Sequence, residues 1–398
     1  MKFQGYRRPD GSIGVRNTIA IISAVNCMNE ATVRIAGGIE GATALPHIGR
    51  CAYLGEDQDR LHNTLVGFGC NPNVAGVLVV GLGCEASPAE KIAAQISKSG
   101  KPTYYLTAEN EGGFDQLVEK GRITAEELVR GLNDIDKEEA EVSELTVAIK
   151  CGGSDTTSGI ASNVVSGSIA DRIISAGGTV IFTETAEVIG AEHILARRAS
   201  SSQVANMVLD KVKDKEQEIL AMGVDLRNCE PTPGNIQGGL TTIEEKSLGS
   251  IVKGGTSPLR GVLEWGQRPE TSGLFFMDGP AHTAEICSGF ASAGAHLMIF
   301  SLGGGLPAML PMTPALSSQF PIMPVIKLTG NPKGYEKIRK HIDIYVGTAV
   351  SGQESISEAS ARAYTELLKF ISEERLGVTE NYTDYSEPLN IYFKGPLV

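Results

Sequence analysis

The sequence lacks any apolar run long enough to cross a membrane, which takes about 18 to 20 residues, so no transmembrane helix is expected. Its first eleven residues contain no apolar stretch of the kind that marks a secretory signal, and we therefore expect a cytoplasmic protein. The chain also lacks an excess of basic residues, because 35 Lys and Arg stand against 47 Asp and Glu. With a net charge of -12, neither nucleic acid nor a membrane surface is an expected partner.

Cysteine motifs of known chemistry are also missing. The chain has 7 cysteines, an odd number, and no Cys-x-x-Cys pair, which argues against a disulfide framework and against a standard zinc motif. Three cysteines are expected to be buried thiols: Cys70, Cys229 and Cys287. Three others lie in polar, glycine-rich loops and are candidates for chemistry: Cys51, Cys84 and Cys151.

Glycine, in contrast, is abundant, with 47 residues in a chain of 398, whereas there is only 1 Trp. This composition is common in α/β enzymes, because glycine-rich loops bring the backbone close to small anionic ligands. The length predicts two or three domains with a large core.

The periodicity of apolar residues predicts an α/β fold with two Rossmann-like parallel-sheet units, at 1–143 and 144–398. In the first unit, strands are expected at 18–22, 74–80 and 102–106, with helices at 29–36 and 88–97. In the second unit, strands are expected at 147–150, 178–182, 274–277, 297–301 and 325–328, with helices at 159–176 and 354–371. The charged segment 108–143 is expected to be a solvated connector, and the polar, glycine-rich segment 225–260 an irregular functional insertion.

Three polar loops follow expected strands, at 81–85, 151–155 and 183–185. Ligands of parallel sheets bind at the carboxyl ends of strands, so this shared placement predicts a site. The loop 151–159, CGGSDTTSG, joins a strand to a helix, and its glycines and free helix N–H groups suit an anion. Taken alone, the loop is equally typical of a turn capped by Ser154 or Asp155 with a buried Cys151 thiol.

His47, Cys51, Cys84 and Cys151 are candidate metal ligands, because imidazole and thiolate bind iron and zinc. Judged by spacing alone, these residues are more typical of a protein that binds no metal at these positions. An iron–sulfur cluster on Cys51, Cys84 and Cys151 is an alternative. Glu184, directly after a strand, is a better candidate for function than Glu187, which we expect to be structural or solvated. Lys246 suits a carboxylate anchor or a desolvated base, although the residues alone favour a salt bridge to a nearby Glu.

Taken together, these segments resemble the altronate/galactarate dehydratase family, which also includes the large subunit of (2R)-sulfolactate sulfo-lyase. The resemblance covers nearly the whole chain. The shared motifs include GYRRPDG at 5–11, GVRN at 14–17, GLGCE at 81–85, CGGSD at 151–155 and EKSLG at 245–249.

The resemblance implies a lyase that removes the C2 proton of a small 2-hydroxy acid, expels a group from C3 and yields a 2-keto acid. Iron(II) is the expected cofactor, with another divalent metal or an iron–sulfur cluster as alternatives. In this scheme Glu184 and Lys246 act as base and carboxylate anchor, in an undetermined order, while Ser154 and Asp155 orient the substrate or metal-bound water. The chain starts at the large portion of the fused family members, which implies a separate small subunit and an oligomer.

Three departures from the family pattern concern the substrate: HIGRCAY at 47–53, LGGGLP at 302–307 and GNIQGG at 234–239. The family usually carries an Arg in the second segment and a Lys in the third, and both are missing here, whereas Arg50 is gained. A compact dianion such as sulfolactate would suit a relocated guanidinium, and neutral drift in these loops is the alternative. We therefore expect (2R)-3-sulfolactate to be converted to pyruvate and sulfite. The alternatives are a sugar-acid dehydratase acting on altronate or galactarate, and a non-catalytic subunit whose site has decayed.

Overall fold

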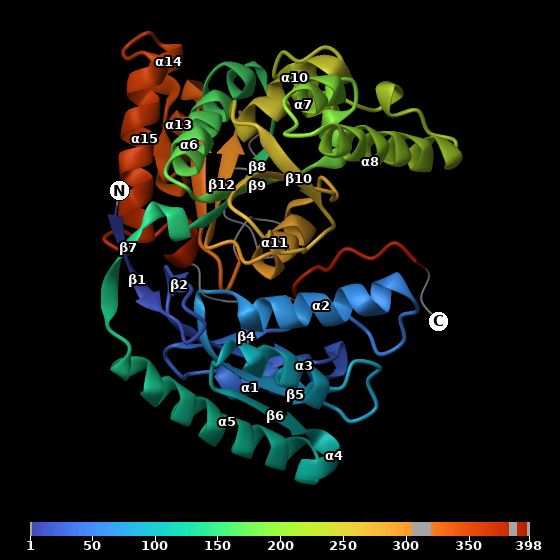
Figure 1. Ribbon diagram of the computed structural model, residues 1–398, viewed down its shortest axis with the longest axis vertical. Helices are drawn as coiled ribbons and strands as arrows, with labels where there is room; N and C mark the ends of the chain where they lie inside the picture. Colours follow the sequence, from blue (N-terminus) through green and yellow to red (C-terminus); the bar gives the residue numbers. More distant parts are fainter. Residues whose placement is uncertain (1, 305–319, 382–387, 396–398) are drawn as a thin grey trace.

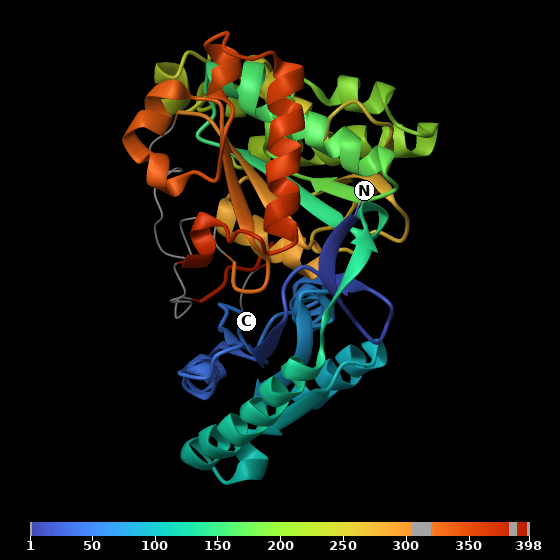
Figure 2. The ribbon, with the colours of Figure 1, turned by 90° about the vertical axis from the view of Figure 1, so that its left-hand side faces the viewer.

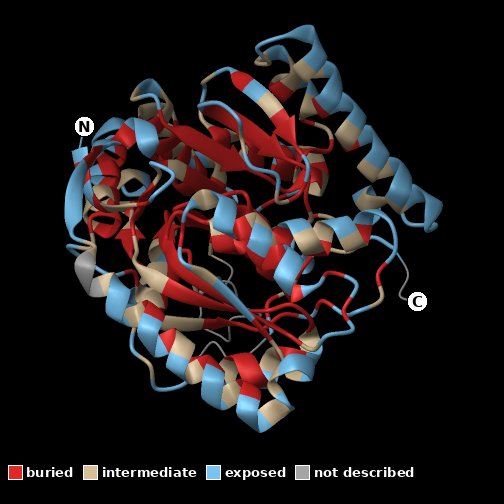
Figure 3. Cartoon of the chain, turned by 60° about the horizontal axis from the view of Figure 1, so that its bottom comes forward, coloured by how far each residue is buried: buried red, intermediate tan, exposed pale blue. Residues whose placement is uncertain are grey.

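The computed structural model describes residues 2–304, 320–381 and 388–395 (Figure 1). Two parallel sheets and one small antiparallel sheet organise the chain, and the predicted α/β class with parallel sheets is confirmed. Figure 3 shows the strands as the most buried parts of the molecule, as expected for sheets covered by helices on both faces.

The first unit contains a four-stranded parallel sheet with the order β4-β3-β5-β6. Its strands are β3 (Thr18–Ser23), β4 (Ala42–Leu45), β5 (Val74–Gly81) and β6 (Thr103–Thr107). Successive residues of β3 and β5 point to opposite faces, so each face has its own apolar core. One face is covered by α1 (Asn29–Ala36) and α5 (Phe114–Arg130), the other by α2 (Glu56–Cys70) and α3 (Ala89–Ile96).

The second unit contains a seven-stranded sheet with the order β10-β11-β9-β8-β12-β13-β14, in which all neighbours are parallel. Its strands are β8 (Thr146–Gly152), β9 (Thr179–Phe182), β10 (Leu259–Leu263), β11 (Gly273–Met277), β12 (Leu297–Leu302), β13 (Val325–Thr329) and β14 (Ile344–Tyr345). Helices α6 (Asn163–Ser175) and α15 (Ile356–Ile371) pack on one face. On the other face α11 (Thr283–Ser292) lies against α2 of the first unit, so one apolar core joins the two units.

A three-stranded antiparallel sheet connects the units at one side of the molecule (Figures 1 and 2). It consists of β1 (Lys2–Arg7), β2 (Ile13–Gly14) and β7 (Lys137–Glu141). The expected connector 108–143 therefore contains α4 (Ala108–Glu111), α5 and an edge strand. The charged side chains of β7 are exposed, as predicted for a solvated segment.

The segment 225–260 corrects the expectation of an irregular insertion, because it contains two helices, α9 (Pro233–Gln237) and α10 (Ile243–Ile251). Thr242 caps α10 by accepting a hydrogen bond from the backbone N–H of Glu245, a local signal that the glycine-rich composition conceals. Before this segment, the long helix α8 (Ser202–Ala221) extends outward (Figures 1 and 3). The remaining short helices are α7 (Glu192–Arg197), α13 (Pro332–Ile338) and α14 (Gly347–Val350). Within the described ranges, no helix is both long and apolar enough to span a membrane.

Candidate active site

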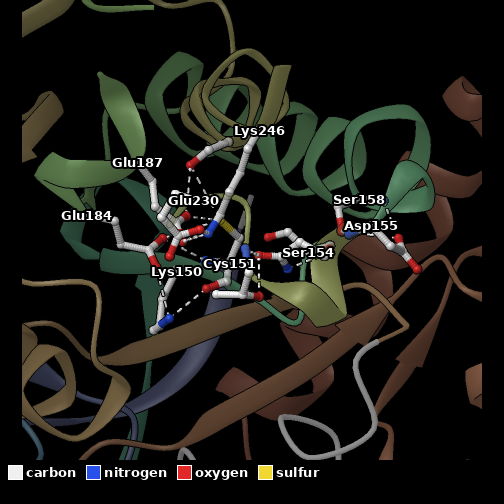
Figure 4. Close-up of polar contacts among 12 residues, drawn as sticks. Lys150, Cys151, Ser154, Asp155, Ser158, Glu184, Glu187, Glu230 and Lys246 are labelled. Carbon is white, nitrogen blue, oxygen red and sulfur yellow. Dashed lines mark hydrogen bonds and ion pairs between the residues drawn. The ribbon is translucent and has the colours of Figure 1, made fainter. Parts of the chain in front are cut away.

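The carboxyl ends of β8 and β9, which are neighbours in the large sheet, bring Cys151 and Glu184 together (Figure 4). The backbone N–H of Cys151 donates a hydrogen bond to Glu184 Oε2 at 3.1 Å, and the Cys151 Sγ lies 3.3 Å from the same oxygen. Both residues are buried, with exposed fractions of 1% and 0%. The contact joins two of the three loops that were expected to follow strands, whereas the third loop, 81–85, follows β5 in the four-stranded sheet.

Glu184 has a left-handed backbone, with φ of 87° and ψ of 67°. This region is unfavourable for a residue with a Cβ and costs about 1–3 kcal/mol, so the surrounding structure must hold it in place. The hydroxyl of Thr183 donates to the carbonyl of Met277, and the N–H of Thr185 to that of Gly279. Strain of this kind concentrates at functional sites, which supports a role for Glu184 beyond packing.

Two buried lysines hold the Glu184 carboxylate. Lys150 Nζ lies 2.9 Å from Oε1, and Lys253 Nζ lies 2.9 Å from Oε2. Burial alone would raise the pKa of Glu184, but the two ammonium groups outweigh it and hold this pKa well below its usual range. Burial, in contrast, raises the pKa of the Cys151 thiol to about 12, so the sulfur is protonated at neutral pH.

A second ion-pair layer contacts this cluster on the side of Cys151. Glu187 Oε2 lies 3.3 Å from Cys151 Sγ, and Lys246 Nζ lies 3.3 Å from Glu187 Oε1 and 2.8 Å from Glu230 Oε2. Burial lowers the pKa of Lys246, but the two carboxylates outweigh it and hold this pKa above its ordinary value. Lys246 is therefore a fixed cation, which suits the anchor of a substrate carboxylate and not the base.

A cavity of about 280 Å³ opens beside Lys246 and Ser250. Ser250 links it to the cluster, because its hydroxyl lies 3.5 Å from Cys151 Sγ and accepts a hydrogen bond from Lys253 Nζ at 2.6 Å. The predicted residues Ser154 and Asp155 also line this cavity. A larger cavity, of about 810 Å³, lies between α2 and the loop after β10 and contains none of the predicted residues. Side-chain chemistry, and not size, therefore selects the smaller cavity.

Asp155 ties together three loops at the carboxyl edge of the large sheet. Its Oδ1 accepts from the N–H of Ser158 at 3.0 Å, the N-cap interaction expected for this turn. Its Oδ2 accepts from the N–H of Gly304 and from Asn331 Nδ2, both at 2.6 Å. The helix that follows begins with a π-helical turn, Ser158–Ser162, a distortion that often marks functional sites. Asp155 thus positions the wall of the cavity that Ser154 also lines.

The remaining candidates lie at the carboxyl edge of the four-stranded sheet. His47 is fully buried, and both ring nitrogens have partners: Nε2 donates to the carbonyl of Ser23 at 2.7 Å, and Nδ1 accepts from the N–H of Gly49 at 2.9 Å. Burial lowers the pKa of His47 to about 4. This imidazole therefore packs as a neutral structural group, and neither ring nitrogen is free for a metal.

Arg50 and Cys51 line a space of only about 10 Å³ together with Glu85. Cys51 and Cys84 are exposed, unlike Cys151. The Glu85 carboxylate accepts from the backbone N–H groups of Leu82 and Gly83 and so stabilises its own turn. The structure does not bring Arg50, Cys51 or Cys84 to the cavity beside Lys246. Cys229, expected to be buried, is exposed.

Among the described residues, one group of three has metal-ligand atoms within 4.8 Å of one another: Cys151, Glu184 and Glu187. This spacing is compatible with a metal ion, and a thiol with two carboxylates suits iron(II) or zinc. Of the four predicted metal residues only Cys151 belongs to the group.

Sequence reasoning missed Lys150 and Lys253, and Glu187, which was expected to be structural or solvated, is a member of this group. A polar residue within the apolar strand VAIKC was the available signal for Lys150. No local signal marked Lys253, because it reaches the site from 102 residues further along the chain.

Models of two protein domains match this chain. The C-terminal domain of D-galactarate/altronate dehydratase matches residues 142–391, and the second domain of D-galactarate dehydratase/altronate hydrolase matches residues 5–133. The chain belongs to the altronate/galactarate dehydratase family. The resemblance stated from the motifs is thereby confirmed.

Individual relatives narrow the class of reaction. The chain is 36% identical to the (2R)-sulfolactate sulfo-lyase subunit beta of Chromohalobacter salexigens, over 92% of both chains. It is 32% identical to the altronate dehydratase of Bacillus subtilis, over 87% of this chain and 69% of that one. It is 31% identical to the galactarate dehydratase (L-threo-forming) of Escherichia coli, over 96% and 74%. All three names denote lyases, which supports the predicted enzyme class, and the name of the first implies a separate partner subunit.

Proposed function

We propose that this enzyme eliminates sulfite from (2R)-3-sulfolactate to give pyruvate. The C2–H bond breaks, its electron pair forms the C2–C3 double bond, and the C3–S bond breaks with its pair leaving on sulfite. The enol of pyruvate then takes up a proton at C3 and becomes the keto acid. The observation that supports an elimination is a cavity that borders a fixed ammonium group, Lys246, and a carboxylate behind it, Glu187.

Five side chains in or behind the cavity wall have a role in this proposal. Lys246 binds the substrate carboxylate, and its charge also favours removal of the adjacent C2 proton. Glu187 takes that proton, because it contacts Lys246 and Ser250, both of which line the cavity. Glu184 lies further back, between two ammonium groups, and acts as a positioning residue for Cys151 and Lys253. Ser154 and Asp155, which also line the cavity, orient the substrate.

Iron(II), the metal expected from the resemblance, has candidate donors in Cys151, Glu184 and Glu187, but Lys253 Nζ already contacts two of these residues, at Cys151 Sγ and Glu184 Oε2. When bound it would supply Lewis-acid stabilisation of the charge that develops as the C2 proton leaves.

Sulfolactate is preferred over a sugar acid because the chain matches the sulfo-lyase subunit over 92% of both lengths, and the dehydratases over a smaller share of theirs. Arg50 gives this choice no direct support, because it is not among the residues that line the cavity. A sugar-acid dehydratase that eliminates water is the second candidate, favoured by the identities of 31–32% to altronate and galactarate dehydratases.

One assay separates these candidates. The anaerobic protein, purified from its source with any polypeptide that accompanies it, is incubated with sulfolactate, altronate and galactarate, and 2-keto acid and sulfite are measured. We expect pyruvate and sulfite in equal amounts from sulfolactate. A 2-keto acid from a sugar acid, without sulfite from sulfolactate, would identify a dehydratase, and no turnover of any substrate would favour a non-catalytic subunit. Activity of this chain with no second polypeptide present would contradict the expected small subunit.

A further inference from the structure

The centre of the buried cluster already contains a cation, the ammonium group of Lys253. This nitrogen lies 3.3 Å from Cys151 Sγ, 2.9 Å from Glu184 Oε2 and 2.6 Å from Ser250 Oγ. A lysine ammonium has three protons to donate, and here each has an acceptor. The Lys253 side chain is 0% exposed, so these contacts take the place of water around the ammonium group.

The backbone around Lys253 is shaped to deliver this ammonium group. Lys253 belongs to the short 3-10 helix Val252–Gly254, which packs directly on α6. The close approach requires Gly167, because a Cβ at that position would lie 2.2 Å from the carbonyl oxygen of Val252. Tight packing of the backbone therefore fixes the position from which the Lys253 side chain reaches Cys151 and Glu184.

Lys253 contacts two of the three residues of the potential metal-ligand group, at Cys151 Sγ and Glu184 Oε2. A transition metal binds sulfur and oxygen at roughly 2.0–2.3 Å, much closer than an ammonium group does. A metal bonded to this pair would therefore lie in direct contact with the Lys253 charge. The other oxygen of Glu184 is also taken, because Lys150 Nζ lies 2.9 Å from Oε1.

The charges of the cluster balance without a metal. Three lysines face three glutamates: Lys150, Lys246 and Lys253 against Glu184, Glu187 and Glu230. A dication added to this set would leave a buried excess of positive charge, which a site of low polarity disfavours strongly.

We propose that Lys253 is the resident cation of the Cys151 site, and that it occupies the place that a divalent metal would otherwise take. The fixed ammonium group, which no motif of the sequence indicated, holds Glu184 and Cys151 in position. Any metal that the enzyme uses then binds outside the Cys151, Glu184 and Glu187 triad. This inference does not depend on which hydroxy acid is the substrate.

Binding of Co²⁺ under anaerobic conditions tests the proposal, because a cobalt–thiolate bond has a charge-transfer absorption in the near ultraviolet. Signal from exposed cysteines is removed by subtracting the spectrum of Cys151→Ser. We expect no Cys151-dependent band in the wild-type protein and a clear one in Lys253→Met, with an apparent Kd for Co²⁺ lower by about tenfold or more. Lys246→Met is the matched control, since it removes a neighbouring ammonium group but leaves Lys253, and it should gain no band.

Two results would overturn the proposal. One is a Cys151-dependent cobalt band in the wild-type protein, and this comparison decides the matter even if Lys253→Met does not fold. The other is a folded Lys253→Met, verified by circular dichroism, that still gains no band. Neither result involves turnover, so failure of the proposed sulfo-lyase reaction in the substrate assay is a separate outcome.

Discussion

The four-stranded and the seven-stranded sheets both end in polar loops that contain a cysteine and a glutamate, but the two edges differ in burial and charge. At the small sheet Cys84 is exposed, and Glu85 accepts hydrogen bonds from its own turn. At the large sheet Cys151 is buried, and Glu184 is held by two ammonium groups. A strand-end motif thus predicts where a site can form, whereas oppositely charged groups from distant segments decide whether one does.

The largest contrast between the two edges should be thiol reactivity. With a pKa of about 12, the Cys151 thiol is ionised to only about one part in ten thousand at pH 8, and burial blocks its approach to reagents as well. We expect iodoacetamide to label Cys51 and Cys84 at least about a thousandfold faster than Cys151, as measured by peptide mass spectrometry over time. Labelling in urea is the control, since it should make all three thiols accessible. Rapid labelling of Cys151 in the native protein would contradict the expected difference in thiol reactivity between the two sheet edges.

The two glutamates provide the next test. Glu184→Gln leaves two buried ammonium groups without their carboxylate, so we expect a loss of about 3–5 kcal/mol in the free energy of unfolding. Turnover should fall by about a hundredfold or more, because Cys151 and Lys253 lose their positioning group. Glu85→Gln is the matched control and should cost only about 1 kcal/mol, with turnover unchanged. Urea denaturation measures the unfolding free energy and the keto-acid assay measures turnover. Equal losses in Glu184→Gln and Glu85→Gln would contradict the expected difference between the two sheet edges.

Substitution of two basic residues, Lys246 and Arg50, tests which sheet edge binds the substrate. Lys246→Met removes the cation beside the cavity, so KM for the hydroxy acid should rise by about 10- to 100-fold, the value of a charge-assisted contact. Arg50→Met should change KM by less than about twofold, because Arg50 lines a separate, much smaller space. Steady-state kinetics decides the matter. A larger effect for Arg50 would show that the edge of the small sheet belongs to the substrate site.

The sequence predicted the sheets well, because buried parallel strands appear as continuous apolar runs. The expected strand at 74–80 and the expected helix at 29–36 match β5 and α1 closely. The prediction of an irregular insertion at 225–260 was wrong, because a capped helix, α10, lies within this polar, glycine-rich segment. Residues 305–307 of the predicted departure at 302–307 lie outside the described residues.

The candidate site was predicted only in part. Cys151 and Glu184 share one signal, a polar residue just after an apolar strand, and the fold places them in contact. Lys253 has no such signal, because its function depends on a tertiary contact between distant segments. His47 had the right chemistry for a metal, but its two nitrogens are used by the Ser23 carbonyl and the Gly49 N–H, which only the folded backbone supplies.

The smallest predicted effect concerns His47 and the pH dependence of stability. Its pKa is lowered by burial to about 4, compared with about 6.5 when unfolded, so between these values the unfolded state binds one more proton than the folded state. The contribution of a neutral His47 to the free energy of unfolding is therefore complete above pH 6.5. It is lost as the pH falls toward 4, at no more than about 1.4 kcal/mol per pH unit. In His47→Gln this loss is absent, so its deficit in unfolding free energy relative to the wild type should shrink by about 1–2 kcal/mol between pH 7 and pH 5. His296, whose pKa is also lowered to about 4, and Asp343, whose pKa is raised to about 6, titrate alike in both proteins, so their effects cancel in the difference. A constant deficit across this range in urea denaturation would mean that His47 is not held neutral by the fold, and would make it available as a ligand at the edge of the small sheet.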